Sequence, residues 1–150
     1  VLVYGASGAV GTNAVQLASR HYGAEVTGVC SAANLDLVRS LGAVRVIDYT
    51  RDDFTRDGPV YDVVFDAVAK VSPSHAKKAL KKTGVYLNVH KDSHAAGKLR
   101  SAELLAVKEL CEAGKLKPVI DRVYPMAEIR AAHRSKMAHA HRLEPPRAQE

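Results

Sequence analysis

Three glycines near the start of the sequence have the spacing of a phosphate-binding turn. Gly5, Gly8 and Gly11 fall three residues apart, and Ala6, Gly8 and Gly11 form an Ala-x-Gly-x-x-Gly variant of the dinucleotide-binding fingerprint. In such a turn one glycine permits the tight bend, Gly8 lets backbone N–H groups approach a pyrophosphate, and Gly11 lets the next helix pack close to the strand. The phosphates would lie at the N-terminus of that helix, where unpaired N–H groups and the helix dipole favour an anion.

The residues around the turn supply the strand and the helix that this motif requires. Residues 1–4 are uncharged β-formers, as expected for a strand buried on both faces of a parallel sheet. After the turn, Gly23 ends a predicted amphipathic helix whose packed face consists of Val10, Ala14, Leu17, Ala18 and His21. Rather than a purely structural turn, we predict dinucleotide binding by Ser7, Gly8, Ala9, Val10 and Gly11.

The end of the second predicted strand, residues 25–30, bears on the choice between the two nicotinamide cofactors. An acidic residue there would bind the ribose hydroxyls of NAD and repel the 2′-phosphate of NADP. The sequence has Ser31-Ala-Ala-Asn34 instead, and Asp36 already lies inside the next predicted helix. Hydroxyl and amide groups can donate to a phosphate, so Ser31 and Asn34 favour NADP(H) over NAD(H). Alternatively, one of these side chains caps the predicted helix over residues 35–41, and one residue can do both.

Strands and helices alternate along the remaining sequence in the manner of a doubly wound parallel sheet. Further strands are predicted at residues 44–48, 62–68, 85–90 and 118–121, giving a Rossmann-type α/β fold of about six strands with helices on both faces. Further helices are predicted at residues 73–82, 101–113 and 126–137. Residues 51–55 are predicted to form a polar helical turn or a loop, and residues 91–98 a loop. The tail over residues 143–150 is expected to be disordered. The dinucleotide-binding domain would then extend over residues 1–142.

The composition argues against several classes of protein. A chain of 150 residues with 47% hydrophobic and 25% charged residues suits one domain with a sizeable core, neither disordered nor fibrous. The sequence has no apolar run of about 18 residues and no signal peptide, so a membrane partner is not indicated. The net charge of +6 is spread along the chain without a dense basic stripe or any Trp, which argues against nucleic-acid binding.

The cysteines and histidines do not predict a metal centre. Cys30 and Cys111 are too few and too far apart for a zinc site or a disulfide framework, and they indicate reduced thiols in a cytoplasmic protein. His139 and His141 are two residues apart, so they would lie on different sides of a helix. Neither these two nor His133 has a carboxylate or cysteine placed beside it, and we expect no bound metal.

Six stretches of the sequence together resemble the coenzyme domain of the medium-chain dehydrogenase/reductase superfamily. The six collinear stretches are Gly5-Ala-Ser-Gly-Ala-Val-Gly11, Gly23-Ala-Glu-Val-Thr-Gly-Val-Cys30, Leu41-Gly-Ala43, Val46-Ile-Asp-Tyr49, Tyr61-Asp-Val-Val-Phe-Asp-Ala-Val68 and Leu116-Lys-Pro-Val-Ile-Asp121. The resemblance as a whole runs from Val1 to about His133. The sequence is most similar to the zinc-independent quinone oxidoreductase branch. Six collinear motifs are far more specific than the glycine turn alone.

The resemblance implies where each part of the cofactor would bind. The pyrophosphate would contact Gly8, Ala9 and Val10. Ser31 would contact the 2′-phosphate region, and Tyr49 would contact the adenosine end. The nicotinamide would face the ends of the fourth and fifth strands, near Val68 and Val89. For Tyr49 the alternative is an exposed aromatic residue at the end of a strand.

The sequence also differs from that branch. Ala32 and Ala33 stand where the relatives usually carry a basic residue. The connection from His90 to Ser101 is shorter than in the family, whose extra segment is often used for dimer contacts. The family's N-terminal catalytic domain and its last apolar strand are absent, and the sequence begins without an initiator Met, so we expect one domain of a larger protein.

Together these features predict the NADP(H)-binding domain of an oxidoreductase that transfers hydride between the cofactor and a carbonyl, quinone or activated alkene or alcohol. We identify no catalytic residue in the chain. The implied partners are the dinucleotide, the missing catalytic domain and a second copy in a homodimer. The glycine spacing also fits short-chain dehydrogenases and epimerases, but none of the tyrosines has the Lys four residues later that those enzymes need. A non-catalytic dinucleotide-sensing module is the other alternative.

Overall fold

The computed structural model describes residues 1–95 and 101–142. Contacts within the chain divide it into two units, Val1–Val119 and Ile120–Glu150, and each is described by itself. The tail predicted over residues 143–150 lies outside the described residues. Among the described helices, none is both long and apolar enough to cross a lipid bilayer.

The first unit is built on a parallel sheet of five strands. The strands are β1 (Leu2–Tyr4), β2 (Thr27–Cys30), β3 (Arg45–Asp48), β4 (Tyr61–Asp66) and β5 (Leu80–Asn88). Their order is β3-β2-β1-β4-β5, so the chain moves outward from β1 to β3 and then crosses to β4 on the other side of β1. Every neighbouring pair is parallel, and Val3 of β1 lies opposite both Gly28 and Phe65. The doubly wound α/β architecture predicted from the sequence is confirmed.

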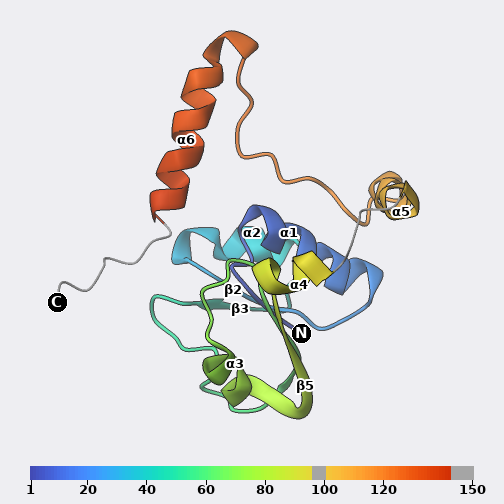
Figure 1. The fold of residues 1–150 in the computed structure, drawn as a ribbon, viewed down its shortest axis with the longest axis vertical. Helices are drawn as coiled ribbons and strands as arrows, with labels where there is room; N and C mark the ends of the chain where they lie inside the picture. The colour runs from blue at the N-terminus through green and yellow to red at the C-terminus, as the bar shows by residue number, and fades with distance from the viewer. Residues whose placement is uncertain (96–100, 143–150) are drawn as a thin grey trace, which may run out of the picture. The chain divides into compact units, whose positions relative to one another are not determined.

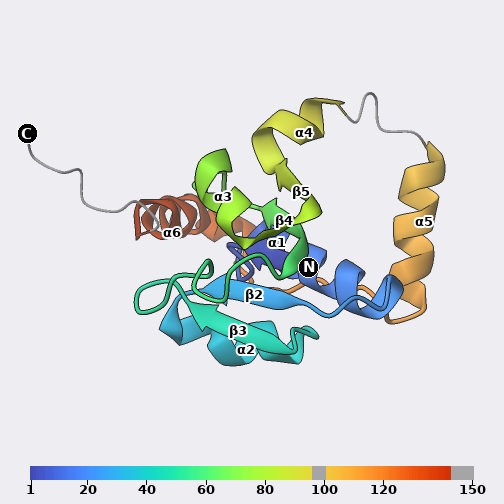
Figure 2. The ribbon, with the colours of Figure 1, turned by 90° about the horizontal axis from the view of Figure 1, so that it is seen from below.

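Helices cover both faces of this sheet (Figure 1). On one face lie α1 (Ala9–Gln16), continued by a π-helical turn over Leu17–His21, and α2 (Leu35–Ser40). Figure 2 shows α2 alongside β2 and β3. The core on this face consists of Val3, Ala6, Val15, Val26, Cys30, Val38, Leu41 and Ala43.

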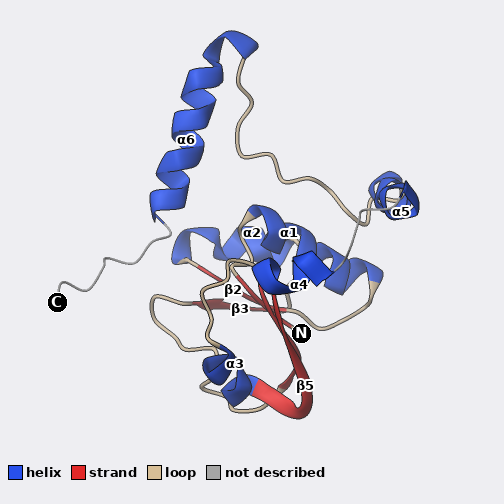
Figure 3. Ribbon diagram, in the orientation of Figure 1, coloured by secondary structure: helices blue, strands red, loops and turns tan. Residues whose placement is uncertain are grey.

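The opposite face is covered by α3 (Pro73–Ala79). Figure 3 shows the strands lying between α3 on one side and α1 and α2 on the other. Ser72 caps α3 by accepting the backbone N–H of His75, and Pro73 occupies a first-turn position where no N–H is needed. The core on this face consists of Leu2, Val29, Ile47, Phe54, Tyr61, Val64, Val71, Ala76, Ala79 and Leu80. The central strands β1 and β2 are buried on both faces, which explains their nearly continuous apolar character.

The fifth strand begins earlier than the sequence predicts. The helix predicted over residues 73–82 ends at Ala79, and β5 starts at Leu80 rather than at residue 85. A Cβ on Gly84 would approach the backbone oxygens of Tyr61 and Lys81 to 3.0 Å. Gly84 therefore permits a close approach beside the irregular start of the β4–β5 pairing, and it does not end a helix.

The residues after β5 form a helix where the sequence predicts a strand end and a loop. β5 stops at Asn88, and α4 (Val89–Ala95) follows directly. The Asn88 side chain accepts the backbone N–H groups of His90 at 3.0 Å and Lys91 at 3.3 Å. Asp92 lies in the first turn and accepts the N–H of Asn88. This capped first turn stabilises a helix that the polar composition alone does not predict.

The sixth strand predicted at residues 118–121 is wrong, because the described chain has no strand there. The preceding segment is bound to α1 instead. The buried Gln16 accepts the N–H of Lys117 at 2.9 Å and donates to its carbonyl oxygen at 3.0 Å. Both backbone groups of Lys117 are thus occupied, and Pro118 has no N–H to give to a sheet.

The predicted helices in the C-terminal third are confirmed. In the first unit, α5 extends over Ser101–Glu112, and Gly114 follows its end with φ of 68°. The second unit contains a short 3-10 turn, Met126–Glu128, and α6 (Ile129–Arg142). This helix continues beyond residue 137, where the predicted one ends.

We expect Gln16→Leu to lower the free energy of unfolding by about 1–3 kcal/mol, because the hydrogen bonds that join the buried Gln16 side chain to both backbone groups of Lys117 would be lost. The measurement is urea unfolding of each variant. Asn13→Leu is the matched control, since Asn13 is an exposed amide on the same helix that bonds only to Ala9 within it. Equal effects of the two substitutions would contradict a structural role for the Gln16–Lys117 contact.

Candidate dinucleotide site

The predicted cofactor residues gather at one edge of the sheet. Parallel strands end at a common edge, and ligands of open α/β sheets bind there, where the strand order reverses. In this sheet the reversal lies between β1 and β4. The glycine turn follows β1, Ser31 follows β2, Tyr49 follows β3 and Val68 lies just beyond β4. Val89, predicted at a strand end, is the first residue of α4 at the same edge.

The glycine turn is fixed to β2 by backbone hydrogen bonds. The N–H groups of Gly5 and Ala6 both donate to the carbonyl oxygen of Val29, at 3.0 and 2.9 Å, and the N–H of Gly8 donates to Gly5 at 3.0 Å. Gly5 has φ of 79°, a left-handed conformation that disfavours any residue with a Cβ. A Cβ on Gly5 would also meet the Val68 side chain at 2.6 Å, so the loops after β1 and β4 touch.

Gly8 and Gly11 have different surroundings. A Cβ on Gly11 would overlap the carbonyl oxygen of Gly5 and lie 2.8 Å from the Cα of Ala6, so only glycine lets α1 pack this close to the turn. A Cβ on Gly8 would meet only Gly5, at an ordinary 3.4 Å. Because the protein itself leaves room at Gly8, a requirement for glycine there would come from a ligand against the backbone.

The first turn of α1 is suited to an anion. Gly8 is its N-cap and provides no side-chain hydrogen bond, and the first turn contains no acidic residue. The side chains of Ala9 and Val10 are exposed, so they do not cover the N–H groups of this turn. A pyrophosphate would accept these N–H groups and would be favoured by the positive end of the helix dipole.

Ser31 has a hydroxyl proton that is available to a ligand. The Asn34 amide donates to the Ser31 hydroxyl oxygen at 3.1 Å, and neither side chain caps the following helical turns. The helix-cap alternative for this pair is therefore wrong. Because the hydroxyl oxygen accepts from Asn34, its own proton remains to be donated.

Asp48, at the end of β3, organises the neighbouring loops and was missed by sequence reasoning. The buried carboxylate accepts the Thr50 N–H at 3.0 Å and the Thr50 hydroxyl at 2.8 Å. These bonds, with smaller contributions from the charge of Arg51 and the N–H of Ala32, lower the pKa of Asp48. An acidic residue just before a predicted loop, with Thr two residues later, was the available signal.

Tyr49 belongs to an aromatic cluster rather than standing alone. Its ring centroid lies 6.4 Å from that of Tyr4, whose ring meets Phe54 edge-on at 5.7 Å. Phe54 in turn meets His75 of α3 at 5.0 Å. These residues line an open cavity of about 480 Å³, together with Thr50, Arg51, Asp52, Asp53, Lys70, Val71 and Ser72. Tyr4, Phe54 and His75 were not among the predicted site residues.

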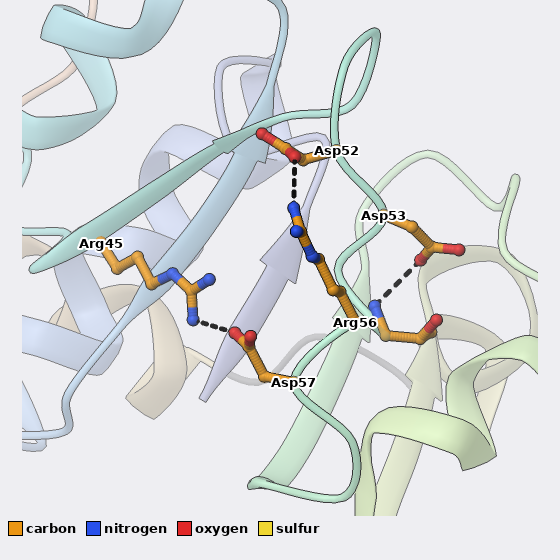
Figure 4. A network of polar contacts seen from close by, with 6 residues as sticks. Arg45, Asp52, Asp53, Arg56 and Asp57 are labelled. Carbon is orange, nitrogen blue, oxygen red and sulfur yellow. Dashed lines mark hydrogen bonds and ion pairs between the residues drawn. The ribbon is translucent and has the colours of Figure 1, made fainter.

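Ion pairs hold the β3–β4 loop beside this cavity (Figure 4). Arg45 of β3 pairs with Asp57, and Arg56 pairs with Asp52 at 3.5 Å. Asp53 accepts the backbone N–H of Thr55 at 2.9 Å and lies 3.2 Å from His75 Nε2. Exposed pairs contribute little stability one by one, but together they select one conformation of the loop that carries Tyr49 and Phe54.

The loop after β4 is held by a buried carboxylate. Asp66 is fully buried and accepts the N–H groups of Val68 at 3.1 Å and Val71 at 2.7 Å. The hydroxyl oxygen of Tyr86 lies 3.2 Å from the Asp66 carboxylate and 2.6 Å from the Val71 carbonyl. Burial raises the pKa of Tyr86, so its hydroxyl stays protonated at neutral pH. This network positions half-buried Val68 beside the glycine turn.

The described residues contain no group of three or more His, Cys, Asp or Glu side chains that could hold a metal ion. His133 is exposed, and the side chains of His139 and His141 lie outside the described residues. Cys30 is buried, which raises its thiol pKa to about 11, and Cys111 is exposed.

Ala69, next to Val68, adopts φ of 55°, which costs free energy in any residue with a Cβ. We expect Ala69→Gly to raise the free energy of unfolding by about 0.5–1 kcal/mol. This value is the backbone strain that glycine relieves, minus the cost of the extra conformational entropy that glycine gives the unfolded chain. Thermal or urea unfolding measures it. Ala67→Gly is the control, because Ala67 is buried without a positive φ, and it should lose about 1 kcal/mol. A loss of stability in both variants would contradict the strain at Ala69.

Comparisons with known proteins agree with this geometry. A family model described as "Zinc-binding dehydrogenase" matches residues 9–122. The mouse (Mus musculus) protein named NAD(P)H oxidoreductase RTN4IP1, mitochondrial, is 32% identical and matches 85% of this chain and 42% of its own length. NADPH-dependent alkenal/one oxidoreductase, chloroplastic, of Arabidopsis thaliana is 35% identical over 88% of this chain and 35% of its own length. The chain thus spans less than half the length of these curated relatives.

Solved structures share the fold. The quinone oxidoreductase from Coxiella burnetii superposes with a TM-score of 0.75 at 24% identity, covering 91% of this chain and 48% of its own. The crystal structure of AibC gives a TM-score of 0.73 at 25% identity, covering 93% of this chain and 49% of its own. At such identities the likeness concerns the fold, which is the predicted coenzyme-domain architecture.

Proposed function

The chain belongs to the zinc-binding dehydrogenase family, and we propose that it is the NADP(H)-binding domain of an oxidoreductase in that family. Its membership of the medium-chain dehydrogenase/reductase superfamily, and its likeness to quinone oxidoreductases, confirm the resemblance found in the sequence. The reaction proposed is hydride transfer between the nicotinamide cofactor and a carbonyl, quinone or activated alkene or alcohol. The short-chain dehydrogenase alternative has no support from these relatives.

The observation that carries the proposal is the contrast between Gly8 and Gly11. The protein needs glycine at 11 for its own packing, whereas at 8 it leaves space beside an exposed helix N-terminus. A pyrophosphate fits that space, because it would approach the Gly8 backbone and accept the N–H groups of Ala9 and Val10.

NADP(H) is favoured over NAD(H) by the groups that follow β2. Ser31 offers a hydroxyl proton, Asn34 holds that hydroxyl in place, and no acidic residue follows the strand directly. Ala32 and Ala33 supply no positive charge, so the preference from this loop is modest. The Arabidopsis relative is named for NADPH, which agrees with this choice.

The chain's own residues bind and orient the cofactor. The adenosine would bind in the aromatic cavity with Tyr4 and Tyr49, and the pyrophosphate would bind at the glycine turn. The loops that carry Val68 and Val89 would face the nicotinamide. The bound nicotinamide supplies the hydride. No residue at this edge is assigned to polarise a substrate, so we propose that a substrate-binding domain completes the site in a longer protein, as the length of the relatives suggests.

Other predictions extend this proposal. A second copy of the chain as a dimer partner, a cytoplasmic location and the absence of a bound metal stay predictions. A dinucleotide-sensing module without catalysis would use the same site. The two functions differ in whether turnover occurs once the substrate-binding part is present.

We expect the chain to bind NADPH and Gly8→Val to abolish that binding, because a β-branched side chain would occupy the space of the pyrophosphate. Isothermal titration measures both dissociation constants. The free energy of unfolding should change by only about 1 kcal/mol, since the new Cβ meets Gly5 at an ordinary distance. Gly8→Ala should give an intermediate loss. Unchanged affinity in a folded Gly8→Val protein would remove the basis of the proposed site.

We expect wild-type NADPH binding to exceed NADH binding on the order of tenfold, because one or two neutral hydrogen bonds contribute about 0.5–1.5 kcal/mol each. Ser31→Asp should reverse the preference, since a carboxylate pairs with the ribose hydroxyls and repels the 2′-phosphate. Ala33→Arg should strengthen NADPH binding through a contact that salt weakens. The measurement is the pair of dissociation constants for each variant, and an unchanged ratio in Ser31→Asp would exclude Ser31 from the 2′-phosphate site.

A further inference from the structure

The cation that the β2 loop lacks is present on the neighbouring loop. Ser31 is followed by Ala32 and Ala33, while Arg51 follows β3 and lines the cavity with Tyr4 and Tyr49. Cys30 lies opposite Asp48 in the sheet, and the N–H of Tyr49 donates to the Cys30 carbonyl at 3.2 Å while that of Arg51 donates to the Asp48 carbonyl at 3.1 Å. Arg51 thus belongs to the same rim of the sheet as Ser31.

The other arginines of residues 1–95 are already engaged. Arg39 pairs with Asp36, Arg45 with Asp57 and Arg56 with Asp52, and Arg20 donates to Gln16 and to the Ser40 carbonyl. Arg51, by contrast, forms no ion pair with any residue that the structure describes. Its guanidinium can therefore bind an anionic ligand without breaking an existing pair.

The backbone beneath Arg51 is held in one conformation. Its own N–H and that of Asp52 donate to the Asp48 carbonyl at 3.1 and 2.9 Å, while the Asp48 side chain accepts both donors of Thr50. A guanidinium on so rigid a turn has fewer conformations to lose on binding than one on a free loop. It also presents donors in a geometry that matches a phosphate group.

On these grounds we propose that Arg51 is the residue that binds the 2′-phosphate of the adenosine ribose and so determines the preference for NADPH over NADH. This proposal rests on the proposed function, because it assigns a specificity residue within the same dinucleotide site. Ser31 donates one neutral hydrogen bond to the phosphate from the β2 side, and Arg51 adds a charge-assisted contact from the β3 side.

The carboxylates around the cavity do not cancel this charge. Asp52 is paired with Arg56, and Asp53 accepts from Thr55 and faces His75. Asp48 is ionised at neutral pH and disfavours a nearby phosphate dianion. The positive charge of Arg51 offsets this repulsion, so that the preference for NADPH from the neutral hydrogen bonds remains. Without that charge the affinities for NADPH and NADH should become similar.

The test compares Arg51→Gln with Arg39→Gln in the same chain by isothermal titration with NADPH and NADH. Arg51→Gln should weaken NADPH binding about tenfold while NADH changes less than about twofold, and most of the salt dependence of NADPH binding should disappear. Arg39→Gln removes an equal charge from an exposed, ion-paired position on α2 that does not line the cavity, so it should leave the NADPH/NADH ratio unchanged. Arg51→Lys should restore part of the preference.

The adenosine fragments locate the effect. Adenosine 2′,5′-bisphosphate should lose affinity for Arg51→Gln, whereas adenosine 5′-monophosphate should not. If the wild-type chain binds NADPH and Arg51→Gln does so equally well, the assignment of Arg51 is overturned and the dinucleotide site stands. A parallel loss of NADPH and NADH in Arg51→Gln would also overturn it. If the wild-type chain binds neither dinucleotide, the proposed function and this inference both fail.

Discussion

The close contact between the start of α1 and the carbonyl group of Gly5 is the constraint on which the site depends. Only a hydrogen atom fits between Gly11 and that carbonyl, so the helix lies directly against the turn that leaves β1. This contact aims the first N–H groups of α1 at the reversal point of the sheet. A longer side chain at 11 would move the helix away and separate its N-terminus from the loop after β4, which touches Gly5 through Val68.

Polar side chains at the ends of three strands shape the rest of this edge. Asp48, Asp66 and Asn88 end β3, β4 and β5, and all three are buried. Each accepts backbone N–H groups from the residues that follow it, which have lost their sheet partners. The chain after β1 uses the carbonyl of Val29 in the same way. Loops bound to the strand ends by such acceptors are rigid enough to hold a ligand in one orientation.

The sequence predicted the alternation of elements well and their contacts poorly. The apolar strands and the glycine turn were recognisable because burial on both faces and close packing leave a local signature. The start of β5 was missed because a helix end and a close approach of strands both use glycine, here Gly84. The false sixth strand at 118–121 was apolar enough, but the backbone before it is bound by Gln16, a contact that spans most of the chain and has no local signal.

The same distinction applies to the site. The residues of the glycine turn could be predicted from the spacing of the glycines. Ser31 could be predicted because it directly follows a recognisable strand. The aromatic cluster was not, because Tyr4, Tyr49 and Phe54 come from separate segments that only the sheet order brings together. The sequence likewise did not indicate a role for Arg51, because that role depends on the pairing of β2 with β3 and on the ion pairs of the other arginines.

The two halves of this edge of the sheet differ in the polar groups that they offer to a ligand. Around the proposed adenosine end lie an aromatic cavity, the Ser31 hydroxyl, a hydrogen-bonded turn, and the Arg51 guanidinium, which forms no ion pair among the described residues. Around the nicotinamide end lie the half-buried valines Val68 and Val89, on loops whose nearby polar groups Asp66, Tyr86 and Asn88 already bind within the protein. Apolar side chains can exclude water and orient a ring, but they cannot move a proton or polarise a carbonyl. Under the proposed function, the described residues would therefore select the cofactor, and the substrate would be selected by other groups.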